Sequence, residues 1–255
     1  MRIMTSNIWG DYFGNPVEVR EDGIFETFRK YAPDVIGLQE ITQGGYNAKL
    51  FKRLSENYRI LGTELFYNNN YVPMVISKAW DILAKGYEYL TETPDQSKAI
   101  TWAVIEKDGK RLGVFNTHFW WKYDCPKDDE IRVQNAKQLV GLMRFVKERF
   151  DCPVFGFGDL NSKRDHPVFK VFQGEKAEVL FDLTENKDDV STMHGDPVAD
   201  EKGFYHGKTT QNPYSMSLDY IIGMGTFKTE QYRVVCDKAI LDATDHSPVF
   251  AEICL

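Results

Sequence analysis

The sequence has only four cysteines, and none of them form a C-x-x-C motif. Cys125, Cys152, Cys236 and Cys254 are scattered without a C-x-x-C pair, so neither a disulfide framework nor a cysteine metal site is expected. No stretch approaches the roughly 18 consecutive apolar residues of a membrane-spanning helix, which excludes such a span. The opening MRIMTSNIWG lacks the basic and apolar regions of a signal peptide, and we therefore expect a cytoplasmic protein.

Positive charge is also scarce. The chain has 31 lysines and arginines against 38 acidic residues, for a formal net charge of −7 at pH 7. No basic run stands out, so a broad electrostatic grip on a nucleic-acid backbone is not indicated. A local positive groove or a bound divalent cation would still be compatible with this composition.

The chain does contain an irregular alternation of strand and helix patterns, with no linker or repeat, which favours a single domain over residues 1–255. Apolar spacing predicts helices over 17–31, 47–58, 128–149 and 166–172. It predicts strands over 2–8, 34–39, 72–77, 82–90, 99–106, 111–119, 153–157, 217–223, 232–237 and 247–253, and a polar loop over 186–210. This order predicts an α+β (mixed α/β) fold in which two sheets pack together with helices outside.

Polar side chains stand where many of these predicted strands begin or end. Rigid strands hold side chains in place and the adjoining loops leave room for a ligand, so functional groups gather at such positions. The residues concerned are Asn7, Glu40, His118, Asp159, Asn161, Asp219, Asp245 and His246.

These residue types fit metal-assisted hydrolysis of a phosphoester. The carboxylates of Glu40 and Asp245 are hard oxygen ligands that suit Mg²⁺ or Mn²⁺. Asp159 is a candidate to take a proton from water, and Asp219 is a candidate to orient His246 and raise its pKa. Taken alone, Asn7 and His118 are better explained as a cap or turn residue and as a satisfied buried histidine, and the others can also be explained as caps, turns or strand ends. Only the catalytic hypothesis predicts all of them together.

The segments NIW, LQE, NTH, GDLN, LDYI and TDHSP occur in that order, and the set resembles the endonuclease/exonuclease/phosphatase superfamily, the DNase I-like fold. The resemblance spans residues 2–253. It implies a four-layer α/β/β/α sandwich with the active site at one edge of two packed sheets. It also implies hydrolysis of phosphodiesters or phosphomonoesters with a divalent metal, usually Mg²⁺, with Mn²⁺ as an alternative.

The same resemblance implies a role for each candidate. Glu40 would bind the metal, with Asn7 and Asp245 close to it, and Asp159 would activate the attacking water. Asn161, Asn7 and His118 would hold the phosphate. His246, oriented by Asp219, would stabilise the charge of the transition state. Trp9 departs from the pattern, because some abasic-site endonucleases have a second acidic residue there.

The substrate is less well defined. We favour a small or single-stranded phosphoester, such as a nucleotide, a nucleic acid or a small phosphodiester. A nuclease on duplex DNA, a phospholipid phosphodiesterase and a non-catalytic binding module are the alternatives. After His118, the side chains of Trp120, Trp121 and Tyr123 would stack a base or sugar, line a head-group pocket, or simply pack under the loop. His194, His206 and Lys208 are candidates for a rim of the cleft.

Overall fold

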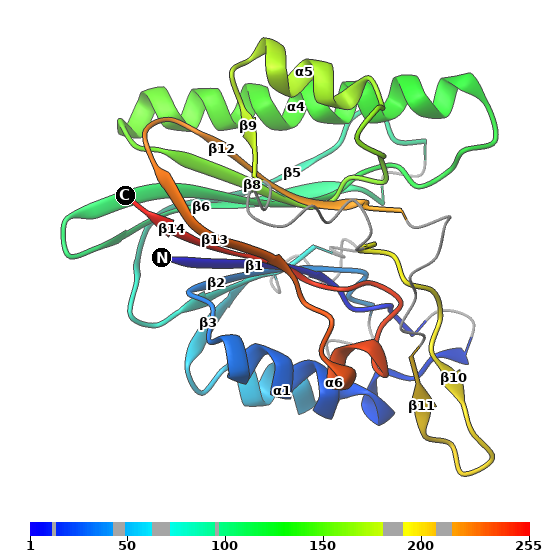
Figure 1. The fold of residues 1–255 in the computed structure, drawn as a ribbon. Coiled ribbons are helices and arrows are strands. Elements are labelled where there is room, and N and C mark those ends of the chain that lie inside the picture. Colours follow the sequence, from blue (N-terminus) through cyan, green and yellow to red (C-terminus); the bar gives the residue numbers. More distant parts are fainter. Residues whose placement is uncertain (12–13, 43–48, 63–71, 95–96, 181–190, 208–215) are drawn as a thin grey trace.

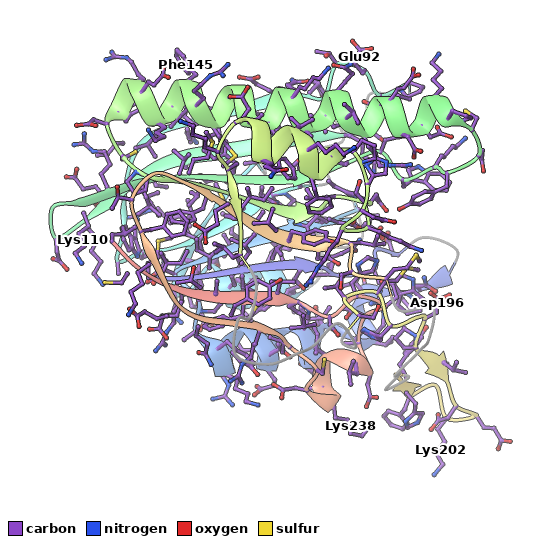
Figure 2. All side chains as sticks on the ribbon, turned by 45° about the horizontal axis from the view of Figure 1, so that its top comes forward. Glu92, Lys110, Phe145, Asp196, Lys202 and Lys238 are labelled. Atoms are coloured by element: carbon purple, nitrogen blue, oxygen red, sulfur yellow. The ribbon has the colours of Figure 1, made fainter. Side chains whose placement is uncertain are left out.

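The structure is a computed structural model that describes residues 1–11, 14–42, 49–62, 72–94, 97–180, 191–207 and 216–255. Two six-stranded sheets lie face to face, and helices cover the outer face of each sheet (Figure 1). The result is the four-layer α/β/β/α arrangement expected for the DNase I-like fold. Side chains fill the space between the layers (Figure 2).

The first sheet has the strand order β13-β14-β1-β2-β4-β3, in which only the β1–β2 pair is parallel. Helices α1, α3 and α6 belong to its side of the molecule. The bounds are β1 Arg2–Asn7, α1 Glu21–Tyr31, β2 Val35–Gln39, α3 Lys49–Leu54, β3 Tyr58–Leu61, β4 Met74–Ser77, β13 Lys228–Val234, α6 Lys238–Leu241 and β14 Val249–Cys254.

The second sheet has the order β5-β6-β7-β8-β12-β9, in which only the β7–β8 pair is parallel. The long helix α4 provides the crossover between these two parallel strands, and α5 packs beside it. The bounds are β5 Asp81–Tyr89, β6 Ala99–Lys107, β7 Lys110–His118, α4 Pro126–Phe150, β8 Val154–Asp159, α5 Val168–Gly174, β9 Glu178–Val179 and β12 Asp219–Met224.

Strand alternation divides the core into three apolar clusters. Ile3 points between the two sheets, whereas its neighbour Met4 points outward beneath α1 and α3. In the second sheet Val114 faces the other sheet and Phe115 faces α4. Because successive strand residues point to opposite faces, a strand covered on both sides must be apolar at nearly every position. This explains the continuous runs MVIS and VFGFG.

The predicted strands and the long helix are confirmed, but several boundaries are wrong. The predicted helix 17–31 begins with a 3-10 turn, Val17–Val19, and α1 starts only at Glu21. The predicted helix 47–58 ends at Leu54, and Tyr58 begins β3, a strand that was not predicted. The predicted strand 232–237 lies earlier, at Lys228–Val234.

Part of the predicted loop 186–210 has regular structure. β10 (Val198–Ala199) and β11 (Tyr205–His206) form a small antiparallel hairpin that projects from the sandwich at the lower right of Figure 1. Residues 186–190 and 208–210, including the candidate Lys208, lie outside the described residues. None of the helices within the described ranges is long and apolar enough to cross a membrane.

Candidate active site

Strand register brings the polar strand ends of both sheets to one edge. In the first sheet Asn7 pairs with Gln39, the residue before Glu40. In the second sheet His118 and Asp219 both pair with Asp159, from opposite sides of β8. The parallel strands end at this edge and the antiparallel β12 begins there, so residues far apart in the chain become neighbours.

Unusual backbone conformations occur at the same edge. Trp9, Glu40 and Asn161 have positive φ angles of 53°, 61° and 45°, which cost non-glycine residues of order 1–3 kcal/mol each. Gly158 has φ 149°, and a Cβ built there would lie 1.9 Å from the carbonyl oxygen of Thr117. Only glycine lets β7 and β8 approach closely enough to present Asp159 next to His118.

Asn7 links the two sheets through its side-chain amide. Its Nδ2 donates to Glu40 Oε1 at 3.0 Å and to Asp159 Oδ2 at 3.1 Å. The second oxygen of Glu40 accepts a hydrogen bond from the backbone N–H of Gly10 at 3.3 Å. Glu40 is therefore fixed in position before any ligand arrives.

Asp159 is the most strongly buried of the acidic strand ends, together with Asp219. Its Oδ1 accepts the backbone N–H of Asn161 at 2.9 Å, and its Oδ2 lies 3.6 Å from His118 Nε2. Burial, reinforced by the negative charge of Asp219, raises the pKa of Asp159 to about 7. A carboxyl group with such a pKa can exchange a proton near neutral pH.

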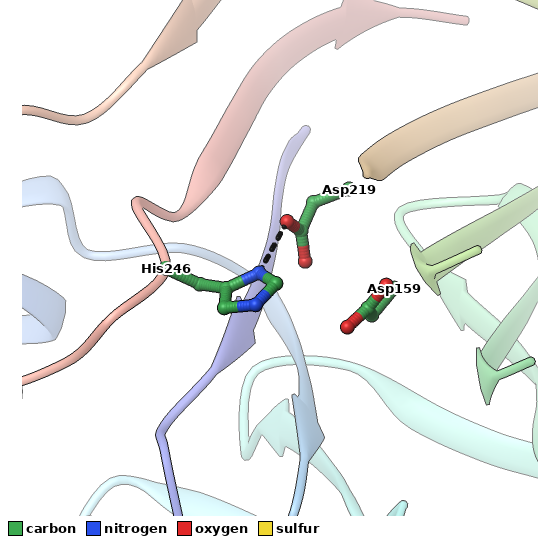
Figure 3. A group of neighbouring side chains, drawn as sticks. All are labelled: Asp159, Asp219 and His246. Carbon is green, nitrogen blue, oxygen red and sulfur yellow. Dashed lines mark hydrogen bonds and ion pairs between the residues drawn. The ribbon is translucent and has the colours of Figure 1, made fainter. Parts of the chain in front are cut away.

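His246 and Asp219 form a buried ion pair (Figure 3), with 2.8 Å between His246 Nδ1 and Asp219 Oδ2. Burial opposes the charge on His246, but Asp219 and Asp245 outweigh it and raise the pKa of His246 well above its ordinary value. The ring is therefore a protonated imidazolium at neutral pH. Because Nδ1 is paired with Asp219, the N–H at Nε2 is the one that remains to donate to a ligand.

His118 is also buried but has the opposite character. Lys98 Nζ lies 3.3 Å from its Nδ1 and 3.2 Å from its Nε2. Burial, Lys98 and His246 all lower the pKa of His118 well below its ordinary value. The site thus holds one charged and one neutral imidazole, on either side of Asp159.

Asp245 carries an oxygen whose bonding is incomplete. Its Oδ1 is buried and has no hydrogen-bond partner among the residues the structure describes. Burial, together with the charge of Glu40, raises the pKa of Asp245 to about 7 against the opposing effect of His246. A buried oxygen of this kind, near a second carboxylate, is a natural ligand for a cation.

The model of the endonuclease/exonuclease/phosphatase family matches residues 4–246 of the sequence. The chain belongs to this family. Members of the family are phosphoester hydrolases and generally depend on a divalent metal. No match was found among curated proteins.

Solved structures of other members share the fold. An endonuclease/exonuclease/phosphatase from Bacteroides vulgatus is 18% identical with a TM-score of 0.74, over 100% of this chain and 98% of that one. The human Nocturnin catalytic domain with a bound sulfate anion is 16% identical with a TM-score of 0.73, over 99% of this chain and 93% of that one. D. rerio TDP2 complexed with a single-strand DNA product is 16% identical with a TM-score of 0.70, over 100% of this chain and 99% of that one.

The donor set of this family member fits a divalent cation at either of two positions. The ligating atoms of Asp159, Asp219 and His246 lie within 4.8 Å of one another. At this first position a cation is disfavoured, because Nδ1 of the protonated His246 already donates a hydrogen bond to Asp219 and cannot bind a metal. Glu40 and Asp245 offer only carboxylate oxygens, one of which lacks a partner, and this pair suits a hard cation better.

Buried polar residues support the site from below. Gln39 Nε2 donates to Asn116 Oδ1 at 2.6 Å, and Asn116 Nδ2 donates to the carbonyls of Leu38 and Pro73, both at 2.8 Å. This amide pair joins β2 of one sheet to β7 of the other. The two sheets are thereby held in register directly beneath Asn7 and Asp159.

Two further residues hold the loops that carry Trp9 and Asp245. Arg20 is buried and donates to the carbonyls of Ile8 and Ala243, which ties the chain after β1 to the loop before His246. The His194 ring contacts the carbonyl oxygen of Thr244 at 2.7 Å and the hydroxyl of Ser247 at 3.1 Å. His194 therefore supports that loop, rather than forming a rim of the cleft.

Hydrogen bonds and ion pairs connect six of the predicted residues: Asn7, Glu40, His118, Asp159, Asp219 and His246. The charges of Glu40 and His246 both influence the pKa of Asp245. Asn161 lies beside them, but one of its amide hydrogens is used on the carbonyl of Phe119 at 3.1 Å. Lys98 was not predicted. The Asp108-Gly109 turn, which pairs Lys107 with Lys110, would have placed it opposite Phe119, next to His118.

Proposed function

We propose that this protein hydrolyses phosphoesters with Mg²⁺, or Mn²⁺ in its place. The observation that carries the proposal is the convergence of buried polar groups at one edge of the two sheets. Asn7 Nδ2 joins Glu40 to Asp159 at 3.0 and 3.1 Å, and the ligating atoms of Asp159, Asp219 and His246 lie within 4.8 Å of one another. A purely structural core has no reason to gather such groups at one sheet edge. Residues 1–255 act as a single catalytic domain in this proposal.

Glu40 and Asp245 would hold the cation, with Asn7 next to it. Bound there, a divalent cation supplies positive charge against the oxygens of a phosphoryl group and lowers the cost of charge that builds up during attack. The Asn7 hydrogen bond to Glu40 fixes the orientation of this ligand and links it to Asp159.

Asp159 would accept the proton of the attacking water. Its Oδ1 is held by the backbone of Asn161, which leaves Oδ2 directed toward the space shared with Asn7 and His118. A base with a pKa near the working pH balances availability against strength. The water would attack phosphorus in line with the leaving oxygen, as phosphoryl transfer requires.

His246 and His118 would contact the phosphate in different ways. The imidazolium of His246, paired through Nδ1 with Asp219, points its remaining N–H at developing negative charge. Neutral His118 donates one hydrogen bond without competing for the proton of Asp159. Asn161 would donate its free amide hydrogen to a phosphoryl oxygen.

We further propose a small or single-stranded phosphoester as the substrate. The formal net charge of −7 and the absence of a basic run do not favour many contacts to a duplex backbone. A salt titration separates this substrate from duplex DNA, since each neutralised phosphate steepens the dependence of affinity on salt.

The test is a panel of nucleotides, oligonucleotides, sugar phosphates and phospholipids, assayed with Mg²⁺, with Mn²⁺ and with a chelator. We expect turnover of at least one class with metal and none with chelator. Asp159→Asn and His246→Ala should each lower kcat by about 10³-fold or more while circular dichroism shows that the variants keep the fold. Asp81→Asn, on the exposed edge strand β5, serves as the matched control. Wild-type rates in either site variant would refute the proposal.

A further inference from the structure

The loop between His118 and α4 passes directly over the segment that carries Asn161. It starts where the backbone N–H of Phe119 donates to the carbonyl of Asp159 at 2.9 Å. It returns to the site at Tyr123, whose hydroxyl donates to the carbonyl oxygen of Asn161 at 2.7 Å. Tyr123 is close enough to the site for the charge of Asp159 to contribute to the raised pKa of its hydroxyl.

The aromatic residues of this loop divide into one buried ring and two exposed ones. Trp120 is buried, and its indole N–H donates to Asp128 Oδ1 at 2.6 Å, so it packs under the loop. Trp121 and Tyr123 are 53% and 54% exposed. Scattered exposed aromatics are common on protein surfaces, and exposure alone therefore decides nothing.

Cationic groups support both exposed rings. The Cζ atom of Arg132 lies 4.2 Å from the ring centroid of Tyr123, and Arg132 itself is fully buried and bonded to the carbonyls of Trp120 and Lys122. The Nζ atom of Lys122 lies 5.6 Å from the ring of Trp121. Tyr123 is thus held by its hydroxyl at one end and by a buried cation over one face, and it cannot turn inward.

Fixed aromatic rings interleaved with a lysine are what proteins use to bind unpaired bases and their phosphates. We propose that residues 121–123 form a stacking platform for an unpaired nucleobase attached to the phosphate that is hydrolysed. The inference rests on the proposed phosphoester hydrolase function, and it narrows the substrate to a nucleotide or the end of a single strand. Because the chain is acidic overall, the ring contacts, more than backbone charge, supply the affinity.

The experiment compares a thymidine trinucleotide with the same backbone carrying abasic residues. We expect the Trp121→Ala/Tyr123→Ala double variant to lower kcat/KM for the base-bearing substrate at least tenfold more than for the abasic one. Tyr123→Phe keeps the ring and should keep the preference. Phe145→Ala is the matched control, because this 60% exposed aromatic lies on α4 about 30 Å along the helix from the loop (Figure 2).

An equal loss on both substrates, or no loss, would overturn the platform. Binding of labelled trinucleotides to the Asp159→Asn protein, followed by fluorescence anisotropy, provides a readout that needs no turnover. If the wild-type protein hydrolyses neither substrate, the proposed function fails on these substrates, and anisotropy still decides the platform. Preference for the base-bearing strand that disappears in the double variant supports it. Equal binding of abasic strands, or tighter binding of a duplex, contradicts it.

Discussion

The two histidines of the site differ in charge although both are buried and both neighbour Asp159. The pKa of His246 is raised by Asp219 and Asp245, while the pKa of His118 is lowered by burial and by Lys98. Burial acts in the same direction on both rings, so the neighbouring charges decide the outcome. Asp159 therefore has one charged imidazole and one neutral imidazole near it, and the neutral ring is kept so by burial and by the positive charge of Lys98.

This difference separates two tasks that a single histidine cannot perform together. In the proposed mechanism the protonated ring would stabilise negative charge on the phosphate, whereas the neutral ring would leave Asp159 free to accept a proton. If both rings were charged, the 3.6 Å contact between His118 and Asp159 would become a full ion pair and weaken Asp159 as a base. Changing the pKa of either histidine should therefore impair the reaction, and the two changes should affect different parts of the pH–rate profile.

Among variants that change the charge of one histidine without removing a ring, the largest effect is expected from Asp219→Asn, because Asp219 is the larger of the two charges that raise the pKa of His246. The pKa of His246 should fall, so the imidazolium is lost at lower pH and the alkaline limb of the pH–rate profile moves to lower pH. We expect kcat at pH 7 to fall by about 10²–10³-fold. The profile of kcat against pH, with the His246 ring signals followed by NMR, checks this. An unchanged alkaline limb would show that Asp219 does not control the ring.

A smaller effect is expected on the other side, from Lys98→Met. Without this cation the pKa of His118 should rise, and at acidic pH the charged ring would pair with Asp159. We expect kcat/KM to fall by about tenfold at pH 6 and by less at pH 8, because catalysis by a base declines once it is paired. Lys98→Arg should retain the wild-type profile, and Lys127→Met, on an exposed part of α4, serves as a control. Parallel profiles for Lys98→Met and wild type would count against this account.

The contrast also shows what the sequence could predict. Asn7, Glu40, Asp159 and His246 were predictable because each lies at or beside the end of an apolar strand, and strand ends of adjacent strands converge. The charge difference between the histidines was not, because it depends on Lys98, which reaches His118 only through the pairing of β6 with β7. The Asp108-Gly109 turn indicates that pairing, but the position of the Lys98 ammonium against the His118 ring depends on side-chain packing that the sequence does not show.

The boundary errors have the same origin. Tyr58 continues the helical spacing of Leu50 and Leu54, but α3 ends at Leu54. The backbone N–H of Asn57 donates to the carbonyl oxygen of Leu54 at 3.2 Å, which forms a turn in place of a further helical turn. Strand β13 is an edge strand whose residues alternate between exposed and half-buried, with few apolar side chains to mark it. Charged, polar edges protect a sheet from pairing with other chains, and they also hide the strand from an apolar pattern.

The smallest effect is expected on the stability of the metal-free protein. Burial and Glu40 raise the pKa of Asp245 from 3.8 to about 7, so the folded state keeps a proton that the unfolded chain releases. The stability contributed by this group therefore falls as pH rises from about 4 to about 7. Asparagine cannot ionise. With chelator, Asp245→Asn should match the wild-type Tm near pH 4.5 and exceed it by a few degrees near pH 7.5, since about 1 kcal/mol shifts Tm by about 2–4 °C at this size.

The Tm of Asp245→Asn has to be compared with that of the wild type at each pH, because the titration of His118 also changes stability with pH. Its lowered pKa contributes stability that increases as pH rises toward 6.5, which opposes Asp245 in the wild-type curve. That contribution is present in both proteins and cancels when the variant is compared with wild type. If the proposed metal site is right, Mg²⁺ should raise the wild-type Tm near pH 7.5 and raise that of Asp245→Asn less, because the variant lacks one carboxylate of that site. A Tm difference that is the same at both pH values would mean that Asp245 is already ionised at pH 4.5, and the charge imbalance between the two sides of Asp159 would then have to come from Asp219 alone.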